Sequence, residues 1–250
     1  MSAVVEIRRL ATPQDLFQAA AEAVLHAASE AIEKRGRFTI ALSGGSTPKS
    51  LYSLIAANAA TSVDWEKVFF FWGDERHVGP NDAESNYRMV EESLFSRISV
   101  PAANIFRVPS ENPDADAAAN AYEQAMRKFF ATAPGAFPRL DVILLGMGPD
   151  GHTASLFPET AALREKTRWV VANWVEKLQT HRITLTLPVL NQARLVAFLI
   201  SGTDKAAALH EVLEGKAPGE KYPSKLVQPV DGKLIWFLDR AASSELSTAA

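Results

Sequence analysis

Short and almost wholly apolar runs recur along the chain, and longer amphipathic stretches separate them. Such runs are typical of β-strands that are buried on both faces of a sheet. They lie at residues 38–42, 68–72, 140–145, 194–200 and 234–238. Apolar positions at helical spacing predict helices over residues 13–34, 84–98, 114–130 and 203–213. The alternation predicts an α/β fold, a doubly wound and mostly parallel sheet with helices on both faces.

One segment departs from this alternation. Residues 168–187 contain WVVANW and ITLTL, in which β-branched residues alternate with others, so we expect one or two further strands forming a small subsidiary sheet. The Pro- and Gly-rich breaks at 133–138 and 217–223 are short enough to be surface connections. We therefore expect a single domain over residues 1–250, with a tail after Ser243 that frays.

Charge and cysteine content restrict the partners and the compartment. The chain has 26 basic and 29 acidic residues, a net charge of -3, so no general attraction to nucleic acid or to an anionic membrane is expected. Zero cysteines exclude disulfides and thiolate metal sites and favour the cytoplasm. Residues 1–10 lack the apolar run of a secretory signal, and no run is long enough for a membrane span. We expect a monomer or weak homodimer.

A glycine-rich turn follows the first apolar run. Gly44, Gly45, Ser46 and Thr47 precede Pro48 and a helical pattern. Glycines let a ligand approach the backbone, and the free amides at a helix start attract phosphate. An ordinary tight turn with an N-cap would give the same pattern. Walker A and GxGxxG spacings are absent, which disfavours nucleotide binding.

The second run ends in the charged sequence Asp74-Glu75-Arg76-His77. Ligands bind at the carboxyl edge of open α/β sheets, so these side chains are candidates for a site. A run of charges by itself more often indicates a solvated loop, and this motif alone favours that interpretation.

A third motif, GMGPDGHTA, presents His152 after the run at 140–145. Its three glycines predict a closely turning loop, and an imidazole at the sheet edge can act as a base at neutral pH. An isolated histidine is ordinarily structural or at the surface, which we expect for His26, His77, His181 and His210. No histidine pair has metal-ligand spacing, so no metal site is predicted.

The motif ISGTDKA repeats the pattern of strand, glycine and helix start, with Lys205 in the first helical turn. A cation there opposes the helix dipole, whereas a lysine that pairs with a bound phosphate is favourable. A solvated surface lysine remains the alternative.

Taken together, LSGGSTPKSLY, FFWGDERHVGPNDAESNYRM, DVILLGMGPDGHTASLFP and LISGTDKA resemble the 6-phosphogluconolactonase family, which is related to glucosamine-6-phosphate deaminases. The resemblance implies cofactor-free hydrolysis of 6-phospho-D-glucono-1,5-lactone in the oxidative pentose phosphate pathway, with His152 as general base. It implies that Asp74 and Arg76 orient the histidine or hold sugar hydroxyls. The implied phosphate site consists of Gly44, Gly45, Ser46, Thr47, Arg182 and Lys205.

Three other functions compete with lactone hydrolysis, and the sequence opposes each to a different degree. An aldose-ketose isomerase or a deaminase that acts on an amino sugar phosphate would use the same phosphate site, with Asp74 as carbon base. Deaminases carry a glutamate five residues after the motif histidine, where this chain has Phe157, a ring that we expect neither to orient the imidazole nor to relay a proton. Glu159 could substitute for that carboxylate. A sugar-phosphate sensor would need a helix-turn-helix, for which the single helix before residue 38 leaves no room, and a metal-dependent lactonase lacks ligand clusters.

Overall fold

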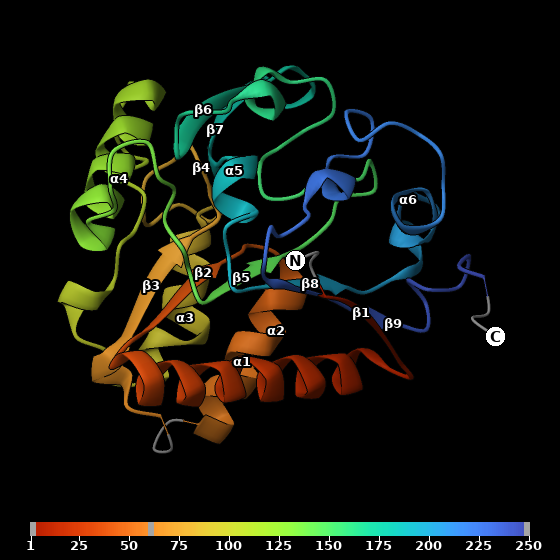
Figure 1. Cartoon of the computed structure of the whole chain (residues 1–250), viewed down its shortest axis with the longest axis horizontal. Helices are drawn as coiled ribbons and strands as arrows, with labels where there is room; N and C mark the ends of the chain where they lie inside the picture. The colour runs from red at the N-terminus through yellow and green to blue at the C-terminus, as the bar shows by residue number, and fades with distance from the viewer. Residues whose placement is uncertain (1–3, 60–62, 248–250) are drawn as a thin grey trace.

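The computed structural model describes residues 4–59 and 63–247, and it is built around a central six-stranded sheet (Figure 1). The strands are β1 (Val4–Leu10), β2 (Phe38–Leu42), β3 (Val68–Trp72), β5 (Val142–Leu145), β8 (Leu195–Ile200) and β9 (Lys233–Asp239). They lie in the order β1-β9-β8-β5-β2-β3, and every pair is parallel. The predicted doubly wound sheet is thus confirmed, because all five predicted strands belong to it.

Strand β1 was not predicted, and its position explains why. It pairs only with β9 at the edge of the sheet, and Val4, Val5 and Ile7 are 45–62% exposed. Charged side chains at Glu6, Arg8 and Arg9 interrupt its apolar residues. An edge strand does not need the continuous apolar run that marks a strand covered on both faces.

Helices cover both faces of the sheet, as predicted (Figure 1). Helices α1 (Pro13–Arg35), α2 (Ser46–Ala59) and α3 (Asn86–Ser93) lie on one face, and α4 (Ala115–Phe130) and α6 (Ala206–Leu213) lie toward the other, with the short α5 (Leu187–Leu190). The long α1 starts at a capping box between Thr12 and Asp15 and ends at Gly36, whose φ of 72° requires the left-handed conformation. Helix α3 is shorter than predicted, because the chain leaves the α-helix at Leu94 and continues as a 3-10 turn.

A second, antiparallel sheet has the order β4-β7-β6, with β4 at Asp74–Arg76, β6 at Val170–Val175 and β7 at Thr180–Leu185. The hairpin of β6 and β7 confirms the predicted subsidiary sheet. Strand β4 shows that the solvated-loop interpretation was wrong: Asp74 and Glu75 are buried. The Glu75 carboxylate accepts hydrogen bonds from the backbone N–H groups of Asn86 and Tyr87 at the start of α3, which offset part of the cost of its burial.

The buried apolar side chains form one continuous cluster that includes both faces of the central sheet. It reaches Leu246, so the tail after Ser243, which we expected to fray, is packed as far as Ser247, whose N–H and hydroxyl donate to Glu214. Residues 248–250 of that tail lie outside the described residues. None of the described helices has the length and apolarity needed to cross a membrane.

Candidate active site

A cleft of about 320 Å³ opens at the carboxyl edge of the central sheet. Its walls are the segments that follow β2, β3, β5 and β8, which meet because parallel strands point the same way. All but one of the predicted site residues line it: Gly44, Gly45, Ser46, Thr47, Asp74, Arg76, His152 and Lys205. Arg182 is the exception. The four motifs therefore converge on one cleft, although they are far apart in the sequence.

The glycine turn after β2 is a rigid wall of this cleft. The Tyr52 hydroxyl accepts from the Ser43 N–H and donates to the Ser43 carbonyl, both at 2.9 Å, which fixes the start of the turn. Gly45 has a φ of 105°, and helix α2 begins directly after it. The turn thus places the amino end of a helix against the cleft, where free N–H groups favour an anion.

Gly44 is required for a different reason, a close approach by Asn86. A Cβ atom on Gly44 would lie 1.8 Å from the Asn86 side-chain oxygen. The Asn86 amide in turn donates to the backbone carbonyl of Asp74 at 2.9 Å. The absent side chain at Gly44 therefore lets the first residue of α3 support strand β4 beside the cleft.

His152 is held by the loop that follows β5. The Gly148 N–H donates to the His152 carbonyl and the Gly151 N–H donates to the Gly148 carbonyl, both at 2.9 Å. Gly148 faces the imidazole so closely that a Cβ atom there would lie 2.1 Å from two ring atoms. The imidazole can occupy its observed position only because residue 148 is a glycine.

The group that orients His152 is Asp150. Imidazole Nδ1 lies 2.5 Å from Asp150 Oδ1, and the other carboxylate oxygen forms an ion pair with Lys177. Burial alone would raise the pKa of the Asp150 carboxyl, but the hydrogen bonds from His152 and Lys177 outweigh it and hold that pKa well below its usual range. An ionised Asp150 accepts a hydrogen bond from Nδ1–H, which leaves Nε2 without a proton as the basic nitrogen.

The opposite face of the imidazole contacts Phe157. The two rings stack with centroids 4.1 Å apart and an interplanar angle of 23°. The expectation that Phe157 plays no part in orienting the imidazole was wrong, because the stacked phenyl ring limits how far the imidazole can tilt. Lys177 adds to this layer, with its Nζ 4.7 Å from the centre of the Phe157 ring.

Asp74 and Arg76 enter the cleft from strand β4. The Asp74 carboxylate accepts from the Ser155 hydroxyl at 2.6 Å, and Arg76 donates to the Glu84 carbonyl at 2.8 Å. The contacts of the described residues thus assign the orientation of His152 to Asp150 rather than to Asp74. Asp74 and Arg76 remain available to hold substrate.

Arg182 lies beside the cleft rather than in its wall. It is the antiparallel register partner of Arg76, so the two guanidinium groups stand on the same face of the small sheet. Burial and the charge of Arg76 lower the pKa of Arg182. Like charges at paired positions destabilise a sheet, so this arrangement favours a bound anion.

Lys205 is placed by the loop after β8. Asp239 accepts the Ser201 hydroxyl at 2.5 Å and the Gly202 N–H at 3.2 Å, which anchors the turn that carries the lysine. Lys205 belongs to a 3-10 turn immediately before α6, and its Nζ lies 2.9 Å from Asp204. Its side chain is 23% exposed and lines the same cleft as the glycine turn.

Several functional candidates were missed by sequence reasoning. Asp150 had a signal, since it stands two residues before His152 in the same glycine loop. Ser155, Asn86 and Lys177 had none, because their roles depend on contacts with distant segments. Ser43 also lines the cleft, and its hydroxyl is buried without a hydrogen-bond partner among the described residues, which makes it available to a ligand. Within residues 4–59 and 63–247, no cluster of three or more His, Asp or Glu side chains could hold a metal ion.

The fold and cleft define an α/β protein with an anion-attracting site and a carboxylate-bound histidine at the carboxyl edge of its sheet. Residues 11–236 match the model of the family described as glucosamine-6-phosphate isomerases/6-phosphogluconolactonase. The chain belongs to this family.

Named relatives lie mainly on the lactonase side of the family. The chain is 48% identical to a 6-phosphogluconolactonase of Nostoc sp., covering 87% of this chain and 88% of the relative. It is 42% identical to a 6-phosphogluconolactonase of Synechocystis sp., and the match covers 95% of this chain and 96% of the relative. The solved 6-phosphogluconolactonase of Trypanosoma cruzi superposes with a TM-score of 0.87 at 30% identity, covering 99% of each chain.

Proposed function

We propose that the protein hydrolyses 6-phospho-D-glucono-1,5-lactone to 6-phospho-D-gluconate, a step of the oxidative pentose phosphate pathway. The observation that carries the proposal is the pair of His152 and Asp150 in a cleft that also holds an anion-attracting glycine turn. The identity to named lactonases over most of the chain supports the same reaction. We further propose a single cytoplasmic domain that acts without a cofactor, as a monomer or weak homodimer.

His152 acts as the general base. With Nδ1–H donated to Asp150, Nε2 takes a proton from a water molecule as its oxygen attacks the lactone carbonyl. The resulting tetrahedral intermediate collapses by breaking the bond between the carbonyl carbon and the ring oxygen. The protonated imidazole returns its proton to that oxygen, so the base is regenerated in each turnover. Asp150 stabilises the imidazolium while it exists.

The substrate phosphate binds between the glycine turn and Lys205. Backbone groups of Gly44 to Thr47 and the amino end of α2 donate to its oxygens, and Lys205 supplies a cation. Arg76 and its neighbour Arg182 extend the positive field along the rim of the cleft. A lactone bound in this way spans the cleft from the phosphate to His152, with Asp74 accepting from sugar hydroxyls.

The contacts of Phe157 and Glu159 favour lactone hydrolysis over deamination. Phe157 stands at the sequence position where a deaminase carries its glutamate, and its ring stacks on the imidazole. Glu159, the carboxylate that could substitute, lines a different cavity together with Leu163 and Leu187, and its backbone N–H donates to the Glu220 carbonyl. It does not line the cleft that contains His152.

The direct test generates the lactone in situ with glucose-6-phosphate dehydrogenase and follows its disappearance with and without the protein. Since such lactones open spontaneously, only the excess over background measures catalysis. His152→Asn should reduce kcat by about 100-fold or more while product still binds. The matched control is His210→Asn, which changes a histidine on α6 that is paired with Glu214. Wild-type kcat in His152→Asn, or ammonia release from glucosamine 6-phosphate by the wild type, would contradict the proposal.

A further inference from the structure

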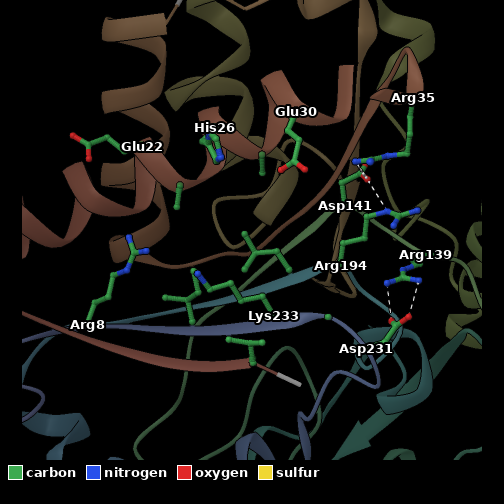
Figure 2. A pocket seen from close by; sticks show the side chains of 16 residues that line it. Arg8, Glu22, His26, Glu30, Arg35, Arg139, Asp141, Arg194, Asp231 and Lys233 are labelled. Atoms are coloured by element: carbon green, nitrogen blue, oxygen red, sulfur yellow. Dashed lines mark hydrogen bonds and ion pairs between the residues drawn. The ribbon is translucent and has the colours of Figure 1, made fainter. Parts of the chain in front are cut away.

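A second cavity lies at the amino edge of the central sheet, at the opposite ends of the strands from the cleft (Figure 2). Arg139 and Asp141 precede β5 and Arg194 precedes β8, whereas Gly146 and Ser201 of the cleft follow these strands. Strand β8 has six residues, which separates the two sites by about 20 Å at about 3.3 Å per residue. The cavity has a volume of about 780 Å³, which is large enough for a metabolite.

Arginines are in excess over carboxylates at one end of this cavity. Arg35 and Arg194 both pair with Asp141 Oδ1, at 2.8 and 3.3 Å. The other oxygen of Asp141 is occupied, since it accepts the N–H and the hydroxyl of Thr39, each at 2.8 Å. Two guanidinium groups thus share a single carboxylate oxygen, which leaves a positive charge without compensation.

Two further arginines extend this cluster. Arg139 forms a double contact with Asp231, and its Nε is buried without a hydrogen-bond partner among the described residues. Arg37 lines an adjoining small cavity with Arg35, Arg139 and Arg194, and its guanidinium lies over the Phe129 ring. Four guanidinium groups and the two carboxylates of Asp141 and Asp231 give the arginine cluster a net charge of about +2.

The cluster is partly withdrawn from water. Side-chain exposure is 34% for Arg35, 35% for Arg139 and 41% for Arg194. Burial, and then repulsion from Arg139 and Arg35, lower the pKa of Arg194. Holding several like charges together in a half-buried position is unfavourable, and a dianion that accepts from their N–H groups would relieve it.

The opposite end of the cavity has a different chemistry. Figure 2 shows Glu22, His26 and Glu30 on α1, across the cavity from Lys233 and Arg8. Carboxylates accept hydrogen bonds from hydroxyl groups but repel further negative charge. The cavity is thus suited to a ligand with one phosphate group and a hydroxyl-bearing body, and unsuited to nucleic acid or polyphosphate.

We propose that this amino-edge cavity is a second binding site, distinct from the lactone cleft, for a small phosphate monoester with a hydroxyl-bearing body. The phosphate binds to Arg35, Arg139 and Arg194, and the body lies along α1 toward His26. Its ligand reaches the protein at the opposite edge of the sheet from His152, so its occupancy does not block the cleft.

The test titrates ribose 5-phosphate into the full-length protein by calorimetry, with ribose as the control that lacks phosphate. We expect binding of ribose 5-phosphate and none of ribose. Arg194→Gln should weaken binding at least tenfold, while the matched control Arg97→Gln, an exposed arginine on a 3-10 turn, should bind as the wild type does. Arg35→Gln repeats the test at a position on the surface of α1, should Arg194→Gln fail to fold.

The Lys205→Ala variant distinguishes binding in the lactone cleft from binding at the arginine cluster. We expect ribose 5-phosphate to bind at the arginine cluster in the Lys205→Ala variant. We also expect the Arg194→Gln variant to retain lactone hydrolysis. Absence of binding to the wild type, loss of all binding in Lys205→Ala, or unchanged affinity in the folded arginine variants would overturn the proposal. None of these outcomes depends on whether the cleft hydrolyses a lactone.

Discussion

Replacing Asp150 by Asn tests whether the hydrogen bond from Nδ1 to Asp150 enables His152 to act as a base. The substitution keeps the size of the side chain but removes the charge that accepts from imidazole Nδ1 at 2.5 Å. A charge-assisted hydrogen bond of this kind contributes about 1.5 to 3 kcal/mol. Because each 1.4 kcal/mol corresponds to about a tenfold rate change, kcat should fall by about 10- to 150-fold. The amide can also donate to Nδ1, which would hold the imidazole in the wrong tautomer and add to the loss.

The assay is lactone hydrolysis over the spontaneous background, with KM and the thermal unfolding midpoint measured on the same samples. KM should change little, because Asp150 does not line the cleft in which the phosphate binds. Asp116→Asn, at an exposed position in the first turn of α4, is the matched control and should retain wild-type kcat. A fully active and folded Asp150→Asn would refute the assignment of Asp150 as the orienting group.

Three further predictions follow from the same contacts. Gly148→Ala should abolish most activity, since its Cβ would displace the His152 ring, whereas Gly79→Ala, with open space at its Cβ, should be silent in both kcat and melting temperature. Lys205→Ala should weaken 6-phosphogluconate binding in calorimetry by about 1.5 to 3 kcal/mol at nearly unchanged stability, and unaltered affinity would make it a solvated lysine. Backbone N–H groups of residues 166–168 lower the pKa of Glu165 from 4.5 to about 2. Because its folded pKa lies below the unfolded value, this carboxylate stabilises the fold above pH 4.5 and loses that contribution as the pH falls toward 2. Urea unfolding of Glu165→Gln should therefore show a deficit of about 1 kcal/mol at pH 7 that vanishes near pH 2, and a deficit independent of pH would contradict this.

The sequence alone determined five of the six strands of the central sheet and the edge where the site lies. Strands covered on both faces need continuous apolar runs, so the composition of short segments predicts where these strands lie. The turns after β2, β5 and β8 can also be recognised from short segments, because close backbone approach or a left-handed conformation requires glycine there. Since parallel strands bring their carboxyl ends together, Gly44, Asp74, His152 and Lys205 were expected to meet, and they line one cleft.

Only the tertiary structure decided which side chains pair with one another. Strand β4 is three polar residues long, and it exists because β7, about a hundred residues later, provides the hydrogen-bonding partner. The register of that pairing sets Arg182 beside Arg76.

The partner of Asp74 and the arginine cluster depend on the same kind of information. The contact of Asp150 with the imidazole is local, whereas the Asp74 carboxylate accepts from the hydroxyl of the distant Ser155. Arg35, Arg139 and Arg194 meet only because β8 lies next to β5 and the end of α1 reaches β2. Hydrophobic periodicity records whether a segment is buried, but strand order and register arise from packing between distant segments, which no local pattern encodes.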